Sequence, residues 1–341
     1  MKFDFVIGNP PYQEDNAGNN RKSPIYHIFM DSAYSIAEKV ELITPSRFLF
    51  DAGQTPKEWN RKILGDEHFK ILTYEANASN IFPNTDIKGG IVISYRDNSR
   101  VFGAINEFII NDVLQNIVNK VKLINFESLS EIHFNRSSYK LTDRIYENFP
   151  ELLGNVNQSE RFAVTSNIFE KLDKIFFEQK PNDDEYYCIL GRENNNRILK
   201  YVNVSYVAEH PNINDWKVFL AKSNGRGDFG EMLAEPEIGK PGMIATQTFI
   251  SFGKFANESE AINLKKYLKT KFSRTLLDIK KVTPDNARKE VWMYVPLQDF
   301  TGDIDIDWSK SIKEIDQQLY KKYNLTNEEI NFIETKVKEM E

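Results

Sequence analysis

Four residues near the amino terminus, Asn9-Pro10-Pro11-Tyr12, have the types and spacing that suit chemistry on a flat amino group. The Asn9 side-chain carbonyl accepts hydrogen bonds and never ionises. Each proline lacks an N–H and holds the preceding residue extended, so the backbone carbonyls are fixed in place and partly free of ladder bonding. Two such acceptors can bind both hydrogens of an exocyclic amino group and aim the nitrogen lone pair at an electrophile. With Tyr12 as a face for ring stacking, the loop predicts amine methylation by positioning and electrostatics.

The elements around this loop must position it. The apolar run at residues 3–7 predicts a strand that delivers the loop to the edge of a sheet. Asn-Pro-Pro alone is typical of an ordinary turn. The strand in front of it and Tyr12 behind it favour the functional interpretation.

The first hundred residues alternate between strand-like and helix-like patterns. Helices are predicted at 26–37 and 57–64, and strands at 40–43, 69–74 and 91–95. This order predicts an α/β fold with a parallel sheet that binds ligands at the carboxyl ends of its strands.

From about residue 105 the pattern changes to that of a mixed α+β domain. Helices are predicted at 105–124, 167–177, 261–280, 311–323 and 327–340, and strands at 186–190, 198–207, 218–221, 243–251 and 291–295. We divide the chain into a first domain at 1–150, a second at 151–310 and a helical carboxyl-terminal tail at 311–341.

Composition excludes several classes of protein. A formal charge of -6 gives no general attraction to nucleic acid, so DNA binding would need a local basic surface. The single cysteine, Cys188, rules out an internal disulfide framework and is compatible with a reducing cytoplasm. Four histidines without cysteine partners predict no metal site. No apolar run is long enough to span a membrane.

The segment from Phe3 to Tyr12 resembles the catalytic motif of DNA adenine methyltransferases, in particular the TaqI-like methylases of type II restriction-modification systems. The resemblance continues at 43–48, 81–90, 189–192, 217–219, 295–300, 319–323 and 328–330, so it covers nearly the whole chain. It implies a partial Rossmann-like methyltransferase sheet followed by a target-recognition domain. It also implies transfer of a methyl group from S-adenosylmethionine to the exocyclic amino group of an adenine flipped out of double-stranded DNA.

The resemblance assigns roles to particular residues. Asn9 and the Pro10 carbonyl would bind the target amino group beside the cofactor, and Pro11 belongs to the same catalytic motif. Tyr12 would stack on the flipped adenine, and Phe82 would pack against that base from its other side or edge. Without the resemblance, Phe82 is better interpreted as a core aromatic residue. Arg47 and Lys88 receive no role.

A local excess of positive charge between residues 265 and 289 predicts contacts with DNA phosphates. The expected DNA-binding residues are Lys265, Lys266, Lys269, Lys271, Arg274, Lys280 and Lys281. The alternative interpretation is a solvated helix face.

The cofactor region expected from the resemblance is missing. In that family a glycine-rich loop for S-adenosylmethionine precedes the catalytic strand, and here nothing precedes it. Residues 225–230 form the pattern Gly-x-Gly-x-x-Gly, but the strand predicted after it ends in no carboxylate, so a cofactor site there is not favoured. We therefore expect a truncated or split enzyme with an open hydrophobic sheet edge, which needs an upstream cofactor-binding half. The alternatives are a non-catalytic DNA-binding specificity fragment and a protein-glutamine or RNA methyltransferase.

Overall fold

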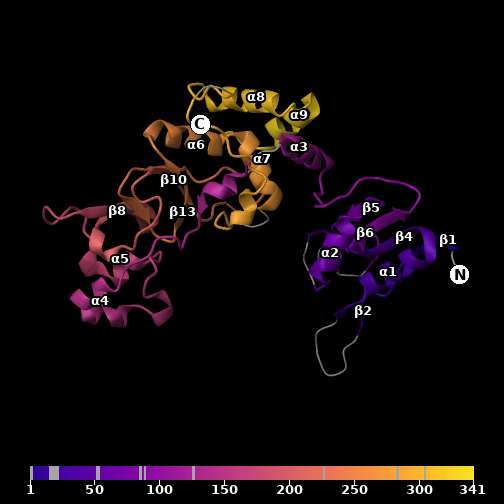
Figure 1. The fold of residues 1–341 in the computed structure, drawn as a ribbon, viewed down its shortest axis with the longest axis horizontal. Helices are drawn as coiled ribbons and strands as arrows, with labels where there is room; N and C mark the ends of the chain where they lie inside the picture. The colour runs from indigo at the N-terminus through magenta and orange to yellow at the C-terminus, as the bar shows by residue number, and fades with distance from the viewer. Residues whose placement is uncertain are drawn as a thin grey trace. The chain divides into compact units, whose positions relative to one another are not determined.

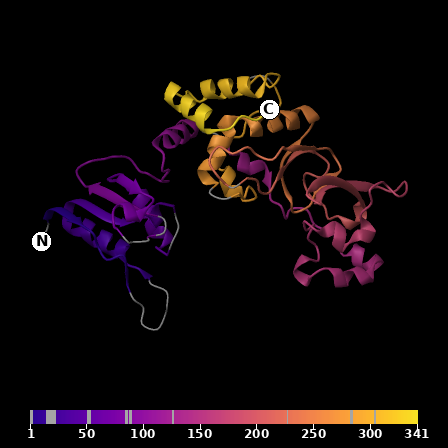
Figure 2. The same cartoon turned by 180° about the vertical axis from the view of Figure 1, so that it is seen from behind.

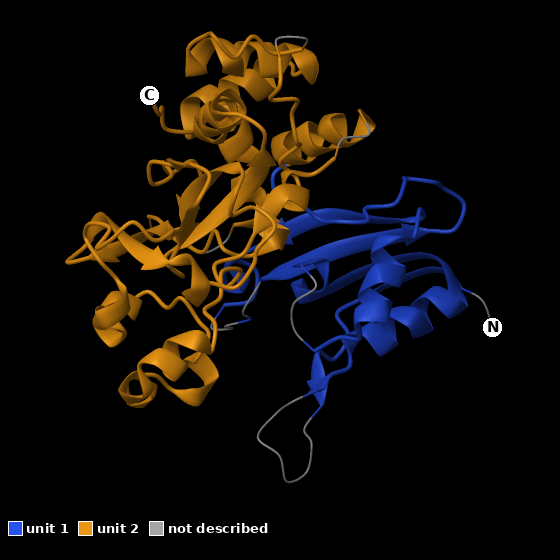
Figure 3. Ribbon diagram, turned by 60° about the vertical axis from the view of Figure 1, so that its left-hand side comes forward, with its two compact units in different colours: residues 1–111 blue, residues 112–341 orange. Residues whose placement is uncertain are grey.

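The computed structural model describes residues 3–14, 23–50, 54–83, 87, 90–124, 127–225, 227–281, 284–302 and 305–341. The chain forms two compact units, unit 1 at residues 1–111 and unit 2 at residues 112–341 (Figure 3). Unit 1 ends before the boundary predicted at residue 150. The reason is that α3 (Asp112–Leu123) packs against α7 (Lys271–Lys280) and α9 (Asn327–Lys336), with a Lys120–Glu329 ion pair of 2.6 Å.

Unit 1 contains a four-stranded sheet in the order β1 (Phe3–Gly8), β4 (Ala37–Pro45), β6 (Ile91–Asp97) and β5 (Phe69–Glu75) (Figure 1). β1 and β4 are parallel, whereas β6 runs antiparallel to both of its neighbours. The prediction of a wholly parallel sheet is therefore wrong for β6. Between β5 and β6 the described residues form only a 3₁₀ turn, η2 (Ala78–Asn80), and no helix that would carry the chain back across the sheet.

One face of this sheet is covered by α1 (Tyr26–Ile36) and α2 (Lys57–Leu64), which were predicted within one residue. Their apolar residues join those of the strands in a single core. Phe48 is fully buried there, with its ring centroid 5.4 Å from that of Trp59. A short ladder of β2 (Gln13–Glu14) and β3 (Ser23–Pro24) stands beside the sheet.

The edge strand β1 leaves apolar side chains uncovered. Phe3, Phe5 and Ile7 are 47%, 44% and 73% exposed. They lie on the face opposite the core, because Val6 is registered with the buried Val40 of β4 and packs against the core. Among the described residues, β1 pairs only with β4. Within the described residues β1 is thus an edge strand with apolar side chains exposed on one face, whereas parallel strands are normally buried on both faces.

Unit 2 combines two sheets with a group of helices (Figure 2). The antiparallel sheet has the order β11 (Glu237–Gly239), β10 (Trp216–Ala221), β13 (Phe249–Phe255) and β7 (His133–Phe134). The other sheet has the order β12 (Met243–Ala245), β8 (Tyr186–Glu193) and β9 (Asn196–Asn203). The remaining helices are α4 (Arg144–Asn148), α5 (Ile168–Lys171), α6 (Glu258–Lys269) and α8 (Ile312–Lys322).

Several predicted elements of unit 2 are interrupted. The predicted helix at 261–280 is two helices, because the Thr270 hydroxyl caps α7 by accepting a hydrogen bond from the Ser273 N–H at 3.1 Å. The predicted strand at 243–251 is divided between β12 and β13. The strand predicted at 291–295 is wrong, since residues 289–292 form a 3₁₀ turn that buries Trp292. The helices predicted at 105–124 and 167–177 are shortened to α3 and α5.

The last two helices are part of the core of unit 2. Their predicted starts are confirmed, because α8 and α9 both begin with a capping box, Ser311 with Glu314 and Thr326 with Glu329. Both helices pack against α7. Nowhere in the part of the chain that the structure describes is a helix long and apolar enough to cross a bilayer.

A lysine is buried in the antiparallel sheet of unit 2. Lys217 of β10 has no solvent exposure. Its ammonium nitrogen donates hydrogen bonds to the backbone carbonyls of Ile213 (2.9 Å), Met243 (3.0 Å) and Lys240 (3.3 Å). Lys217 thereby joins β10 to the segment just before it, at Ile213, and to the residues that lead into β12, at Lys240 and Met243.

Candidate functional site

The acceptor loop, residues 9–12, follows the carboxyl end of β1. The loop is anchored at Tyr12, whose carbonyl accepts a hydrogen bond from the Ile25 N–H at 3.1 Å. The half-buried Tyr12 side chain also packs against the core of unit 1. Asn9, in contrast, is exposed. The loop is therefore anchored to the core of unit 1 through Tyr12, whereas the side-chain amide of Asn9 faces solvent.

The side chains of Asn9 and Tyr12 are neighbours. Burial raises the pKa of Tyr12, and the Asn9 side chain beside the hydroxyl opposes that rise. The phenol is therefore neutral at ordinary pH, as a surface for stacking a base requires.

The loops that follow β1, β4 and β5 meet at one end of the sheet. Gly8 is registered with Leu42, three residues before the end of β4, and Ile91 at the start of β6 is flanked by Pro45 and Glu75. This end of the sheet is the usual place for ligands in an α/β fold.

Phe82 is the predicted site residue that follows β5. It comes just after η2, is half-buried, and donates its N–H to the Ala78 carbonyl at 2.8 Å. The structure therefore brings Asn9, Tyr12 and Phe82 to the same end of the sheet. Residues 84–86 and 88–89, which include Lys88, lie outside the described residues.

Two residues at this end were not singled out from the sequence. Thr44 is fully buried, and its hydroxyl has no hydrogen-bond partner among the described residues. Gly90 has a φ of +82°, and a Cβ on it would lie 2.3 Å from the Glu75 carbonyl oxygen. Only glycine allows this close approach between the end of β5 and the start of β6. Their places inside the resembled segments 43–48 and 81–90 were the only available signal for these two residues.

The predicted DNA-binding lysines of α6 are occupied by internal partners. Lys265 and Lys269 both pair with Glu235, at 2.9 Å and 3.1 Å. Lys266 donates a hydrogen bond to the Trp308 carbonyl at 2.6 Å. These lysines therefore join α6 to an earlier segment of unit 2, at Glu235, and to a later one, at Trp308.

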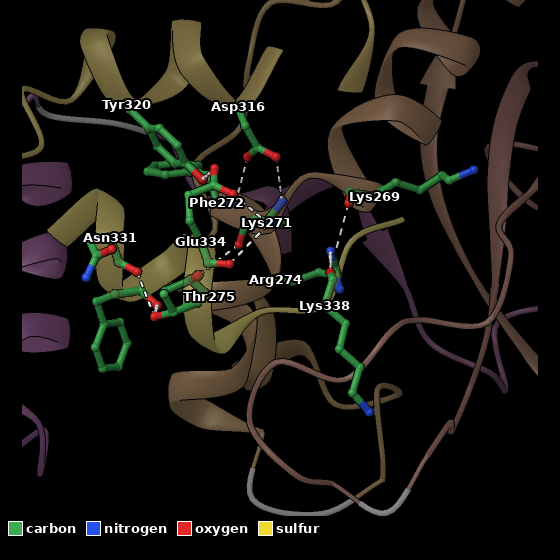
Figure 4. A network of polar contacts seen from close by, with 12 residues as sticks. Lys269, Lys271, Phe272, Arg274, Thr275, Asp316, Tyr320, Asn331, Glu334 and Lys338 are labelled. Carbon is green, nitrogen blue, oxygen red and sulfur yellow. Dashed lines mark hydrogen bonds and ion pairs between the residues drawn. The ribbon is translucent and has the colours of Figure 1, made fainter. Parts of the chain in front are cut away.

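The cations of α7 are also used inside unit 2 (Figure 4). Lys271 pairs with Glu334 at 2.6 Å, and Arg274 donates to the carbonyls of Lys269 and Lys338. Lys280 lies over the Tyr294 ring at 5.4 Å.

Burial decides how many of these cations can reach a phosphate. Lys269, Arg274 and Lys281 are only 8%, 1% and 3% exposed, so in this conformation they cannot do so. DNA contact by the others, Lys265, Lys266, Lys271 and Lys280, stays a prediction. The basic residues between 265 and 281 therefore mainly form ion pairs and hydrogen bonds within unit 2.

The glycine-rich loop of unit 2 lacks the context of a cofactor loop. It follows β10 but leads into β11, and no helix begins between Gly227 and Glu237 in the described residues. Gly230 donates its N–H to Asp278 at 2.7 Å, and its carbonyl accepts the Lys338 N–H at 2.9 Å. A phosphate-binding loop of this kind needs a strand before it and a helix after it.

Comparison with known proteins bears on the amino-terminal segment. Residues 1–82 match the family model described as Eco57I restriction-modification methylase. This segment is therefore similar to restriction-modification methylases. A protein of Mycoplasma pneumoniae named "Uncharacterized adenine-specific methylase" is 32% identical over 96 residues, which is 27% of this chain and 22% of that protein. The predicted resemblance to restriction-modification adenine methylases is confirmed for the amino-terminal part of the chain, and for the later segments it stays a prediction. The chain spans about a fifth of the length of this curated relative.

Two solved restriction enzymes are similar in structure at low scores. The type IIG restriction endonuclease BpuSI aligns with 92% of this chain and 48% of its own, at 11% identity and a TM-score of 0.31. The type IIL restriction-modification enzyme MmeI, solved with DNA, aligns with 97% of this chain and 56% of its own, at 10% identity and a TM-score of 0.36.

Proposed function

We propose that this chain carries the amino-group clamp and the target-recognition part of a DNA adenine methyltransferase. The observation that carries the proposal is the acceptor loop at the carboxyl end of β1, inside the segment that matches restriction-modification methylases. Asn9 and the Pro10 carbonyl bind the amino group of a flipped adenine, and Tyr12 and Phe82 contact its ring. S-adenosylmethionine, when bound, would supply the methyl group, and Asn9 and Pro10 are the residues that would contact it.

We further propose that a separate cofactor-binding half completes the sheet at β1. Among the described residues no strand pairs with the outer edge of β1, so its backbone groups and the exposed Phe3, Phe5 and Ile7 suit burial by a parallel neighbour. In the part of unit 2 that the structure describes, the glycine-rich loop lacks the helix that a cofactor loop needs after it, which supports a cofactor site elsewhere. The occupant that fits is therefore a polypeptide carrying the S-adenosylmethionine-binding strands.

Reconstitution tests this function. The full chain is mixed with the polypeptide encoded immediately upstream of it, and methyl transfer from radiolabelled S-adenosylmethionine to duplex DNA is measured. We expect label in adenine only when both polypeptides are present. Transfer by the chain alone would contradict the split arrangement. DNA binding without transfer, even in the mixture, would favour the non-catalytic specificity fragment.

Substitution at the β1 edge tests the docking surface. Phe5→Ser combined with Ile7→Ser should weaken binding of the cofactor-binding half by roughly tenfold or more, since two apolar side chains would no longer be buried. The melting temperature of the chain alone should hardly change, because both side chains are already exposed. The matched control is Leu72→Ser, which changes a 44% exposed residue on the opposite edge strand. Equal loss of binding in the control would contradict this docking surface.

A further inference from the structure

A groove of about 400 Å³, lined mostly by polar and charged residues, lies at one end of the antiparallel sheet of unit 2. Residues 135–137 follow the end of β7, and residues 222–223 follow the end of β10, which runs in the same direction. Residues 285–288 form the remaining wall. The groove is lined by Asn135, Arg136, Ser137, Lys222, Ser223, Asp285, Ala287 and Arg288.

The charges in this groove are unbalanced. Three cations, Arg136, Lys222 and Arg288, face a single carboxylate, that of Asp285. Arg288 lies 3.9 Å from this carboxylate, and neither Arg136 nor Lys222 forms an ion pair within the described residues. Burial and the charge of Arg136 lower the pKa of Lys222, and Asp285 opposes that shift. An anion between Arg136 and Lys222 would remove their mutual repulsion.

The wall of the groove is fixed by buried hydrogen bonds. Asn286 has no exposure, and its N–H donates to the Lys222 carbonyl at 2.7 Å. The Asn286 carbonyl accepts the Trp292 indole N–H at 2.9 Å. On the other side, the Gln247 amide donates to the Ser137 hydroxyl at 3.3 Å. The cations are therefore held on a preformed surface, which lowers the entropic cost of binding a ligand.

In another basic pocket of unit 2, three of the lysines already have partners. It lies by α6, and its lining includes Lys265, Lys266 and Lys269. Their ammonium groups are already held by the Glu235 carboxylate and the Trp308 carbonyl. A phosphate there would have to displace these contacts.

We propose that the groove binds the phosphodiester backbone of duplex DNA through Arg136 and Lys222. Guanidinium and ammonium groups form charge-assisted hydrogen bonds with phosphate oxygens, and the Ser137 and Ser223 hydroxyls add neutral donors of the kind that fixes a duplex in register. This inference rests on the proposed function. In that function, the groove is the surface by which unit 2 holds the DNA substrate.

Salt dependence tests this inference. Binding of the full chain to a fluorescent duplex is measured by anisotropy at several salt concentrations. The double variant Arg136→Ala with Lys222→Ala should reduce the slope of log Kd against log salt by about 2, because each lost phosphate contact removes about one released counterion. The loss should be similar for duplexes of different sequence. Inorganic phosphate should compete only weakly, because it lacks the other phosphates of a duplex, and phosphate binding as tight as that of the duplex would overturn the assignment to a DNA backbone.

The controls separate this inference from other effects. Lys174→Ala with Lys310→Ala makes the same change in net charge at two cations that pair with Glu151 and Asp307, and it should leave the slope unchanged. Arg136→Lys with Lys222→Arg keeps the charges and should retain binding. Because Arg136 is exposed, Arg136→Glu alone covers the case in which the double variant fails to fold. An unchanged slope in the double variant Arg136→Ala with Lys222→Ala would contradict DNA binding by the groove. It would leave the proposed methyltransferase function untouched. If the groove binds DNA but the reconstituted mixture transfers no methyl group, only the proposed methyltransferase function is contradicted.

Discussion

Replacing Asn9 with alanine should reduce methyl transfer by the reconstituted enzyme by about 10²- to 10³-fold, the usual effect of removing one group aimed at the charge that develops in a transition state. Asn9 supplies one of the two acceptors proposed to hold the amino group, and the other, the Pro10 carbonyl, remains in the variant. The rate is measured as single-turnover transfer of labelled methyl groups to duplex DNA.

The location of Asn9 makes the result interpretable. Its side chain is exposed, so the variant should keep its melting temperature and its affinity for DNA. Tyr12→Phe is the matched control, because it removes the hydroxyl beside the Asn9 amide and keeps the ring for stacking. It should cost far less activity than Asn9→Ala. Full activity in Asn9→Ala would contradict the clamp.

Lys217→Met should lower the free energy of unfolding of unit 2 by about 2–3 kcal/mol at neutral pH. The substitution keeps most of the volume but removes hydrogen bonds to three backbone carbonyls, each worth about 1 kcal/mol. Urea unfolding, followed by tryptophan fluorescence, measures the change. An unchanged unfolding midpoint would contradict a stabilising role for Lys217.

The same variant should change how stability depends on pH. Burial lowers the pKa of Lys217 to about 7, with Asp215 opposing the shift, whereas an unfolded lysine titrates near pH 10.4. Between these values the unfolded chain binds a proton that the folded chain does not. The free energy of unfolding should therefore rise with pH from about 7 to about 10, and this contribution should be constant below pH 7. Lys217→Met should remove that slope, and substitution of the exposed Lys254 by methionine should not.

Local signals predicted much of unit 1. The apolar spacing in α1 and α2 and the alternation in β1 depend on neighbouring residues alone, so these elements were predicted within one residue. The acceptor loop was predicted for the same reason, since Asn9 and Tyr12 follow a strand directly. The direction of β6 could not be predicted in this way, because it depends on what the connection from β5 allows.

The roles of the basic residues depend on partners far away in the sequence. The sequence alone predicts that Lys271 and Arg274 are surface charges. In the structure Lys271 pairs with Glu334, and Arg274 donates to the Lys338 carbonyl. Arg136 and Lys222 are far apart in sequence and stand in no charge run. Only the meeting of the ends of β7 and β10 places them in one groove.

The ties between the early and late helices of unit 2 affect when it can fold during synthesis. Lys120 of α3 can pair with Glu329, and Arg274 can bind the Lys338 carbonyl, only after these later residues have been synthesised. Contacts of such long sequence separation form slowly, because a long loop must close before they contribute. On the ribosome, unit 1 can complete its sheet early, whereas the nascent unit 2 lacks the Lys338 carbonyl that Arg274 binds until residues near 338 emerge. Chaperone capture of nascent chains should accordingly fall sharply once these residues have left the exit tunnel.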